Sequence, residues 1–262
     1  MQAVLRLKKK RFREREQRFI VEGVNFVEEA LKSGVELDFL VCTEKGLQRE
    51  KSKSLLEYQA KAGIPIYIVD EDVFAKIAET ETPQGVLAVG RKPVWEEDKI
   101  LERDKGIWVA LDAIQDPGNL GTIIRTAEAV GAEAVFLGEG TADLYNPKAL
   151  RATMGSVFRV PTFSRVNLGE LLGRMKKSGI FVVAADPHAE QIYYEADLRH
   201  LRVAVVIGNE GRGIDRHLLE LSDIRVKIPL EGKVESLNAA VASALILFEI
   251  RRQQQLWLQG AV

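Results

Sequence analysis

Apolar positions recur at helical spacing in some stretches of the first half of the chain and form short continuous runs in others. Residues 19–31 place Val24, Val27 and Leu31 on one face and lead to a Ser-Gly pair, a pattern that predicts a helix with a glycine stop. The further elements expected before residue 92 are a strand at 38–42, a helix at 54–62, a strand at 64–69, a helix at 72–78 and a strand at 86–89. Residues 1–92 are therefore predicted to form a small α/β domain.

Apolar runs and helical stretches alternate more regularly in the second half. Residues 93–105 are charged and contain proline, which is typical of a linker. The strands expected beyond this linker are 107–111, 134–137, 180–185, 203–207 and 224–228. Such alternation favours a mostly parallel sheet with helices on both faces, so residues 106–262 are predicted to form one α/β domain. Ligands collect at the carboxyl ends of strands in such sheets.

Composition narrows the classes of protein that fit. The chain has 262 residues, one cysteine and three histidines without ligand spacing, so we expect neither an intramolecular disulfide nor a metal site. The cysteine, Cys42, lies in an apolar run and is expected to be a buried structural thiol. No apolar stretch approaches the roughly 20 residues of a membrane span, and the charged start does not resemble a secretory signal. A cytoplasmic protein without a membrane partner is therefore expected.

Charge is balanced over the whole chain but not at its start. The formal net charge is -1, whereas residues 1–18 contain eight lysines and arginines against two glutamates. A run of this kind is either a solvated basic arm or a patch that binds nucleic acid through its phosphates. The composition of the run alone leaves both interpretations open.

The first segment with candidate chemistry, DAIQDPGNLGTIIRTA, follows the strand expected at 107–111. A Pro-Gly turn leads into a helix, and Asn119 lies where that helix is predicted to begin. A purely structural role is available for each polar side chain. Asn119 suits an N-cap that accepts a backbone N–H, and Arg125 suits a surface partner for Glu128, three residues further on.

The second segment, VIGNEGRGI, includes the end of the strand expected at 203–207. Its three glycines allow a tight turn and a close approach of the backbone to a ligand. Their spacing, G-x-x-G-x-G, differs from the G-x-G-x-x-G of dinucleotide-binding folds. Glu210 also has a structural interpretation, because an acidic side chain is favoured near the positive N-terminus of the helix that follows.

The third segment, IPLEGKVESLNAAVASA, begins at the end of the strand expected at 224–228 and runs into a helix predicted from Leu237. The small residues of this helix permit close packing against another element. Ser236 suits a plain N-cap of the same helix. Each of the three segments thus has a structural interpretation when it is taken alone.

Taken together, the three segments resemble, in order and spacing, the motifs of the SpoU/TrmH RNA 2′-O-ribose methyltransferases, a branch of the SPOUT superfamily. The stretches DPGNLGTIIRTAEAVGA, VIGNEGRGI and IPLEGKVESLNAAVASALILFE are highly specific as a set, and the resemblance covers residues 106–252. The first segment of the chain, with its basic start and FIVEGVNFVEEAL, resembles more loosely the small RNA-binding domain of that family, which is similar to a ribosomal-protein fold.

This resemblance implies a fold, a cofactor and partners. The fold class is α/β: a C-terminal SPOUT-type, mostly parallel sheet with a deep trefoil knot, preceded by a small ribosomal-protein-like α/β domain that binds RNA. The cofactor is S-adenosylmethionine, held largely through backbone groups, and a homodimer forms through the C-terminal domain. The residues implied to line the cofactor site are Gly208, Ile228, Leu230 and Leu237.

The resemblance also implies methylation of a ribose 2′-hydroxyl in structured RNA, with 23S-type ribosomal RNA favoured over transfer RNA by the length of the chain. The family assigns proton removal to the arginine that corresponds to Arg125, assisted by RNA phosphate. Because the free pKa of arginine is above about 12.5, Arg125 is either a base in a special environment or a group that holds phosphate and orients the hydroxyl. The residues implied to shape this site are Asn119, Glu210, Ser236 and Asn238.

Two other classes of protein fit the sequence less well. A non-catalytic RNA-binding protein on the same fold is disfavoured because Asn119, Arg125, Glu210 and Asn238 are all present. A Rossmann-type nucleotide enzyme would need G-x-G-x-x-G after its first strand. The strand expected at 107–111 leads instead into Gln-Asp-Pro-Gly-Asn.

Overall fold

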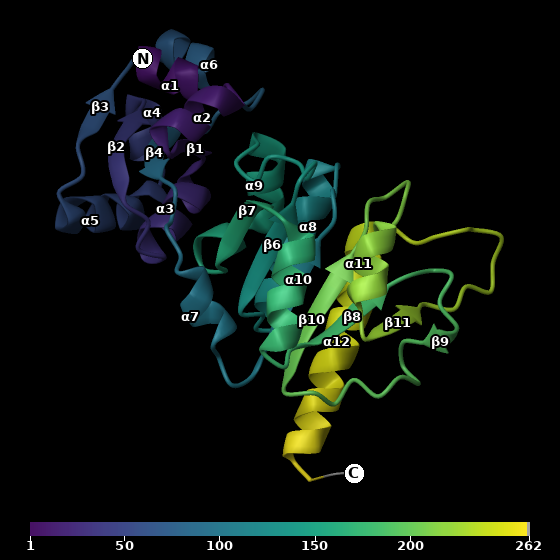
Figure 1. Ribbon diagram of the computed structural model, residues 1–262. Coiled ribbons are helices and arrows are strands. Elements are labelled where there is room, and N and C mark those ends of the chain that lie inside the picture. Colours follow the sequence, from purple (N-terminus) through teal and green to yellow (C-terminus); the bar gives the residue numbers. More distant parts are fainter. Residues whose placement is uncertain (261–262) are drawn as a thin grey trace. The chain divides into compact units, whose positions relative to one another are not determined.

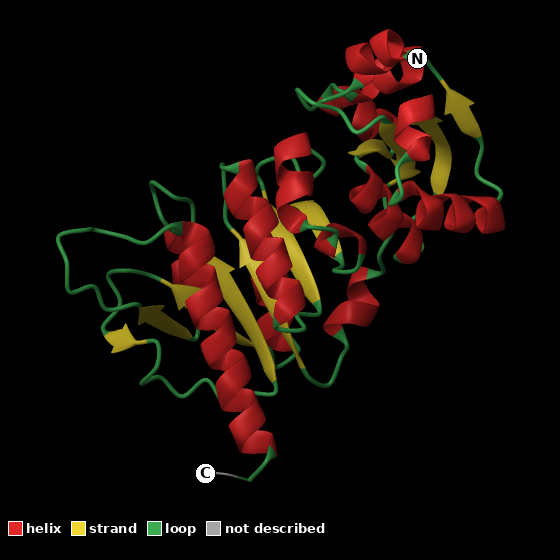
Figure 2. Ribbon diagram, turned by 180° about the vertical axis from the view of Figure 1, so that it is seen from behind, coloured by secondary structure: helices red, strands yellow, loops and turns green. Residues whose placement is uncertain are grey.

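The computed structural model describes residues 1–260 and divides the chain into two compact units, each with its own sheet (Figures 1 and 2). The first unit comprises Met1–Val94 together with Tyr145–Arg159, and the second comprises the rest of the chain. None of the helices described is long and apolar enough to cross a membrane. Among residues 1–260, no group of histidine, cysteine, aspartate or glutamate side chains is arranged to hold a metal ion.

The first unit is built on a four-stranded sheet of order β1-β4-β2-β3. Its strands are β1 (Arg18–Glu22), β2 (Leu37–Cys42), β3 (Ile66–Ile68) and β4 (Val86–Arg91). Strand β4 is antiparallel to β1 and β2, and β3 is parallel to β2. The helices of this unit before residue 94 are α1 (Gln2–Leu7), α2 (Lys10–Glu16), α3 (Val24–Lys32), α4 (Glu44–Gln48), α5 (Ser52–Ala62) and α6 (Glu71–Ile77). Apolar side chains of α1 and α6 are buried against β2 and β4.

The helix predicted over residues 19–31 is wrong at its beginning. Residues Arg18–Glu22 form strand β1, and helix α3 starts only at Val24. Phe19 and Val21 are fully buried while their neighbours are half-exposed, so the burial alternates with the period of a strand. Gly23, with a φ of 103°, separates the strand from the helix. The predicted glycine stop at Gly34 is confirmed, because α3 ends at Lys32 and Gly34 has a φ of 73°.

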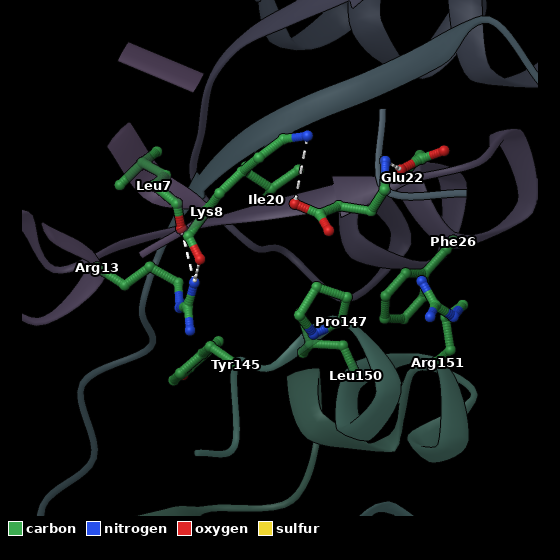
Figure 3. A pocket seen from close by; sticks show the side chains of 11 residues that line it. Leu7, Lys8, Arg13, Ile20, Glu22, Phe26, Tyr145, Pro147, Leu150 and Arg151 are labelled. Carbon is green, nitrogen blue, oxygen red and sulfur yellow. Dashed lines mark hydrogen bonds and ion pairs between the residues drawn. The ribbon is translucent and has the colours of Figure 1, made fainter. Parts of the chain in front are cut away.

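A segment from the second half of the sequence packs within the first unit. Tyr145–Arg159 carries α9 (Pro147–Thr153) and the short 3-10 helix η1 (Ser156–Phe158). The ring of Phe158 lies 5.2 Å from that of Phe26 and 6.0 Å from that of Phe19, measured between centroids. Arg159 forms an ion pair with Glu29 at 3.0 Å. Figure 3 shows Tyr145, Pro147 and Leu150 on one side of a small pocket, which is otherwise lined mainly by residues of the first 30 positions.

The second unit contains a seven-stranded sheet of order β7-β6-β5-β10-β8-β11-β9, and all of its ladders are parallel. The strands are β5 (Gly106–Leu111), β6 (Ala134–Gly138), β7 (Thr162–Val166), β8 (Phe181–Ala185), β9 (Gln191–Ile192), β10 (Arg202–Ile207) and β11 (Ile224–Lys227). The predicted parallel sheet is thus confirmed, and each of the five predicted strands is present. The two strands that were not predicted, β7 and β9, lie at the edges of the sheet.

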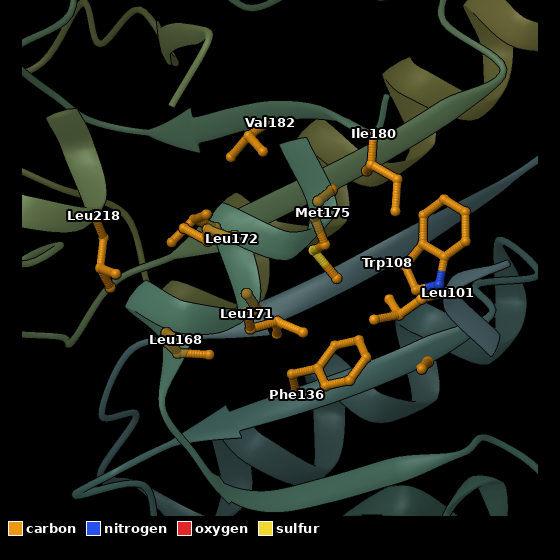
Figure 4. Close-up of a cluster of buried hydrophobic side chains, with 14 of the residues drawn as sticks. Leu101, Trp108, Phe136, Leu168, Leu171, Leu172, Met175, Ile180, Val182 and Leu218 are labelled. Carbon is orange, nitrogen blue, oxygen red and sulfur yellow. The ribbon is translucent and has the colours of Figure 1, made fainter. Parts of the chain in front are cut away.

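Helices cover both faces of this sheet, as predicted. They are α7 (Glu97–Leu101), α8 (Pro117–Ala129), α10 (Leu168–Lys177), α11 (Arg216–Leu221) and α12 (Ala239–Leu258). On one face, Leu172 and Met175 of α10 pack over Trp108 and Phe136 from the sheet (Figure 4). On the other face, α12 packs against α8 and against strands β8 and β10. The strands are buried between these helices, which explains their continuous apolar sequences.

The segment 93–105, predicted as a linker, contains helix α7, and the structure groups it with the second unit from Trp95 onward. Ile100 and Leu101 are buried in the same core as Trp108. Arg174 of α10 forms ion pairs of 2.6 Å with Glu97 and with Asp98 of this helix. The charged residues at the start of this segment are thus on a short amphipathic helix whose apolar residues are buried.

Candidate functional site

The site lies at the carboxyl end of the second unit's sheet. Strands β5 and β10 are neighbours, with Leu111 opposite Ile207, so the chain segments that leave them start side by side. Strand β10 is also next to β8, and β8 is next to β11. Parallel strands end at the same edge of a sheet, and the order of these strands therefore gathers the three predicted segments at one edge.

Helix α8 begins earlier than predicted. It starts at Pro117, which needs no hydrogen-bond acceptor for its nitrogen, and Asp116 is the N-cap. The Asp116 carboxylate accepts a hydrogen bond of 2.9 Å from the backbone N–H of Asn119. Asn119 is consequently not the N-cap that the sequence suggested. It lies in the first turn, where its side chain remains available for contacts outside the helix.

Glu210, on the loop after β10, accepts three hydrogen bonds from the start of α8. The donors are the backbone N–H groups of Gln115 at 3.0 Å and Asp116 at 3.1 Å, and the side-chain Nδ2 of Asn119 at 3.0 Å. Glu210 therefore interacts with the N-terminus of α8, and not with the helix that follows it in sequence. Burial raises the pKa of the Glu210 carboxyl, but these hydrogen bonds outweigh burial and leave the pKa below its ordinary value of 4.5.

Asn119 and Asn238 connect the first and third segments. The Nδ2 of Asn238 donates a hydrogen bond of 2.8 Å to the Oδ1 of Asn119. The Oδ1 of Asn238 accepts from the backbone N–H of Ala240 at 2.9 Å, and Asn238 is the N-cap of α12. The cap that the sequence suggested for Ser236 is thus provided by Asn238. Because Asn119 also donates to Glu210, its amide joins all three segments in one network.

Sequence reasoning missed two polar residues that hold the second segment in place. The Asp112 side chain is only 9% exposed, and its carboxylate accepts from the backbone N–H of Asp215 at 2.8 Å and from Arg212 at 3.3 Å. The Nδ2 of Asn209 donates a hydrogen bond of 2.8 Å to the carbonyl oxygen of Ala113. Ala113 has a φ of 54°, a left-handed conformation that is costly for alanine. The signal that was available is their position at the ends of buried strands, one residue after β5 for Asp112 and two residues after β10 for Asn209.

The glycine at the end of β10 is required by the tightness of the following loop. A Cβ atom on Gly208 would lie 2.3 Å from the carbonyl carbon of Gly213. Asn209 and Gly213 exchange two backbone hydrogen bonds of 3.0 Å across the same turn. The predicted close fold of this glycine-rich segment is therefore present, and it places the Glu210 side chain beside α8.

The loop between β11 and α12, an irregular connection in Figure 1, carries three of the residues predicted to cradle the cofactor. Ile228, Leu230 and Leu237 are half-buried, so they offer apolar surface without being part of the core. Within the described residues, no backbone or side-chain group of residues 229–237 makes a hydrogen bond. Free backbone donors and acceptors next to apolar side chains suit a nucleoside-containing ligand. This donor set fits the backbone-mediated binding of S-adenosylmethionine that the sequence implied.

Two of the predicted residues are not joined to this network. Arg125 lies on the exposed side of α8, two turns after Asn119, and its side chain makes no hydrogen bond or ion pair within residues 1–260. The surface pairing with Glu128 that the sequence suggested is therefore absent from the described part of the chain. Ser236 is exposed in the loop before α12. The thiol of Cys42 is buried in the first unit, and burial raises its pKa to about 12, as expected of a structural cysteine.

Comparison with known proteins agrees with this geometry. Residues 106–248 match the SpoU rRNA Methylase family, and residues 1–88 match the MRM3-like substrate binding domain. The chain is 40% identical over 247 residues to the 23S rRNA (guanosine(2553)-2′-O)-methyltransferase RlmP of Bacillus subtilis. The alignment covers 94% of this chain and 93% of that protein. The protein belongs to the SpoU rRNA methylase family, and the resemblance drawn from its three segments is confirmed.

Solved structures show the same relationship. The SpoU methyltransferase AviRb from Streptomyces viridochromogenes, in complex with the cofactor AdoMet, superimposes with a TM-score of 0.86 at 31% identity and covers 97% of each chain. A structure that concerns 2-OH methylation of C/U34 on tRNA has a TM-score of 0.53 at 29% identity and covers only 58% of this chain. The predicted fold class is confirmed by these relatives, and the trefoil knot is inferred from membership of the family.

Proposed function

We propose that this protein transfers a methyl group from S-adenosylmethionine to a ribose 2′-hydroxyl of 23S ribosomal RNA. The observation that carries the proposal is the hydrogen-bond network of Glu210, Asn119 and Asn238, which joins the three characteristic segments at one edge of the sheet. RlmP is a 23S rRNA 2′-O-methyltransferase, and its sequence similarity to this chain extends over 94% of the chain, which supports the same substrate. As a member of its family the protein is an RNA 2′-O-ribose methyltransferase, and S-adenosylmethionine is its methyl donor.

The cofactor, when bound, supplies an electrophilic methyl group, so the chain itself has to position the acceptor and manage its proton. The loop with Ile228, Leu230 and Leu237, together with the turn at Gly208, holds the cofactor. Arg125 binds an RNA phosphate and orients the 2′-hydroxyl, because an exposed guanidinium without an intramolecular partner is free to make a bidentate contact. Asn119, Glu210 and Asn238 fix the start of α8 and thereby the position of Arg125. Ser236 contributes to the same site from the loop before α12.

The first part of the chain is the substrate-binding domain in this proposal. Residues 1–92 bind the RNA, residues 93–105 join the domains, and residues 106–262 carry the catalytic site. The match of residues 1–88 to a substrate binding domain supports this division. The tRNA-related structure covers little more than half of this chain, which favours ribosomal RNA over transfer RNA. A cytoplasmic location follows from such a substrate.

A homodimer through the second unit is also part of the proposal. Helix α12 has an exposed apolar stripe at helical spacing, formed by Val241, Leu245 and Phe248 with exposed fractions of 49%, 37% and 52%. We expect Phe248→Glu to convert a dimer into a monomer in size-exclusion chromatography with light scattering, because the charge would be buried at the interface. Val94→Glu, at a side chain that is 93% exposed, is the control and should leave the mass unchanged. A dimer that survives Phe248→Glu would place the interface elsewhere.

Mapping of the product tests the proposed reaction. We expect 23S ribosomal RNA from a strain that lacks the protein to gain one methyl group when it is incubated with the purified enzyme and S-adenosylmethionine. Mass spectrometry should locate the methyl on a ribose fragment. The linkage that follows the modified nucleotide should resist alkali, because the 2′-oxygen that attacks the phosphodiester is blocked.

The control for this experiment is an RNA fragment with a 2′-deoxynucleotide at the mapped position. It should bind through its surrounding nucleotides but accept no methyl group, since the 2′-hydroxyl is the nucleophile. A methyl group on a nucleobase, or transfer to the deoxy fragment, would contradict the assignment of the acceptor.

A further inference from the structure

Helix α2 in the first unit presents two arginines on an aromatic side chain. Arg11 and Arg15 are exposed and lie one turn apart. Phe12, which stands between them in the sequence, is half-buried. The guanidinium carbon of Arg11 is 4.7 Å from the centroid of the Phe12 ring, and that of Arg15 is 4.8 Å from it. Both distances are within the range of a cation–π contact. The two guanidinium groups are thus held near one ring at the surface.

The charge of these arginines is scarcely neutralised. Arg11 makes no hydrogen bond or ion pair within residues 1–260, and the ion pair of Arg15 is with the adjacent Glu16 at 3.0 Å. Lys9 and Lys10 are exposed immediately before them. Exposed ion pairs between neighbours are weak, so a strong anion can compete with Glu16 for Arg15.

A third arginine of the same helix has a different role. Arg13 is buried, and its Nη1 donates hydrogen bonds to the carbonyl oxygens of Leu7 at 2.7 Å and Lys8 at 2.8 Å, at the end of α1 (Figure 3). These bonds attach α2 to the helix before it. The surface that carries Arg11 and Arg15 is therefore attached to the fold of the first unit.

Stacking determines which part of each arginine is available. A guanidinium that lies against an aromatic ring keeps the N–H groups at its edge free, and these match two phosphate oxygens at once. The ring also restricts the side chain before binding, which reduces the entropy lost when a phosphate is bound. Two such groups one turn apart suit successive phosphates of a nucleic-acid strand better than a single small anion.

We propose that Arg11, Phe12 and Arg15 form a clamp for backbone phosphates of the substrate RNA. The inference rests on the proposed function for the identity of the RNA, and it assigns to α2 a contact that increases affinity without taking part in methyl transfer. Phosphate contacts position a nucleic acid but carry no sequence information. The clamp therefore determines how tightly the RNA is held and leaves the choice of nucleotide to other residues.

The decisive variant is the double substitution Arg11→Met and Arg15→Met in the full-length protein. Methionine keeps apolar cover on Phe12 but removes both charges. We expect the Kd for a 23S ribosomal RNA fragment to rise about 10-fold and its plot of log affinity against log salt to become less steep by about 1.5, because each lost phosphate contact accounts for roughly 0.7 to 0.9 of slope. The KM for RNA should rise in parallel, while kcat and the affinity for S-adenosylmethionine stay within about 2-fold.

Matched controls separate the clamp from general charge. Arg49→Met with Lys53→Met removes two exposed cations, also four residues apart, from the same unit and should change the RNA affinity by less than about 2-fold. Arg11→Lys with Arg15→Lys keeps the charge but loses the planar groups, and Phe12→Leu keeps the arginines but loses the ring. Each should raise the Kd about 3-fold, which is less than the methionine pair.

The outcomes distinguish the clamp from the reaction it serves. Wild-type RNA affinity and salt dependence in the methionine pair would show that the arginines only cover Phe12, and the proposal would be overturned. If the methionine pair lowered the melting temperature, the lysine pair and Phe12→Leu would serve as the test in its place. Wild-type RNA affinity in both of these variants would also overturn the proposal. Failure of the wild-type enzyme to methylate ribosomal RNA would refute the proposed function alone, since the clamp is judged by binding.

Discussion

Replacement of Arg125 by alanine is expected to lower the rate of methyl transfer at least about 100-fold while the affinity for S-adenosylmethionine stays nearly unchanged. The side chain is exposed on α8 and has no partner within residues 1–260, so its loss removes no contact that supports the fold. It belongs to none of the groups that line the proposed cofactor cradle. Single-turnover rates with saturating RNA, together with calorimetric titration of the cofactor, measure the two quantities separately.

The control for this variant is Arg216→Ala on α11. Arg216 is also exposed, with a side chain that is 92% accessible, and it pairs with Glu220 one turn away. Its loss should leave the rate within about 2-fold of the wild type. Near-normal turnover of the Arg125 variant would remove that residue from the reaction. Retention of part of the rate by Arg125→Lys, with an unchanged pH profile, would support phosphate binding over a role as a base.

The parts of the fold that could be predicted are those in which one physical signal dominates. Strands buried between helices are continuous apolar runs, and for this reason all five predicted strands of the second sheet are present. The edge strand β7 (Thr162–Val166) has half-exposed and exposed residues, and β9 has two residues, so neither produces such a run. The segment from Phe19 was predicted as a helix because later residues have helical spacing. It is part of strand β1, which is held by pairing with β4.

The site shows a comparable division between what motifs indicate and what only the fold reveals. Asn119, Glu210 and Asn238 could be named because they stand in recognisable segments, but their hydrogen bonds join positions 91 and 119 residues apart. The expectation that each polar side chain caps its own helix failed because the strand order brings a different helix closer. Glu210 contacts α8, and Asn238 takes the cap that Ser236 was expected to provide. Asp112 follows directly after a buried strand, but its hydrogen bonds could not be predicted, since its partners depend on the conformation of the loop after β10.

The carboxylate of Glu210 has a pH dependence whose direction follows from its contacts. Its pKa in the folded protein is lower than the ordinary value of 4.5. The contribution of the ionised carboxylate to the stability of the folded protein is therefore fully present above pH 4.5. The contribution is lost only as the pH falls through the lowered folded-state pKa. Protonation of Glu210 therefore does not limit the enzyme near neutral pH, and Glu210→Gln reproduces at neutral pH the state that the wild type reaches only in acid.

We expect Glu210→Gln to lower the rate of methyl transfer about 10- to 100-fold. The amide has one acceptor oxygen in place of two. Its NH₂ group would face either the backbone N–H of Gln115 or the N–H groups of Asp116 and Asn119, because these bond to different oxygens of Glu210, and the donors it faces would be left without a partner. A shift of about 1 Å in the start of α8 is enough for a loss of this size, because the reaction depends on placement of the acceptor.

Two further variants make this prediction specific to Glu210. Glu210→Asp keeps the charge on a shorter side chain and should recover part of the rate. If the loss of rate came only from a structural defect, keeping the charge would not recover it. Glu220→Gln on α11 removes an exposed carboxylate that pairs with Arg216 and should leave the rate within about 2-fold. The cofactor affinity of Glu210→Gln should stay within about 3-fold, because the cradle at residues 228–237 is untouched. Wild-type turnover in Glu210→Gln would show that the contact between the second segment and α8 has no part in positioning the acceptor.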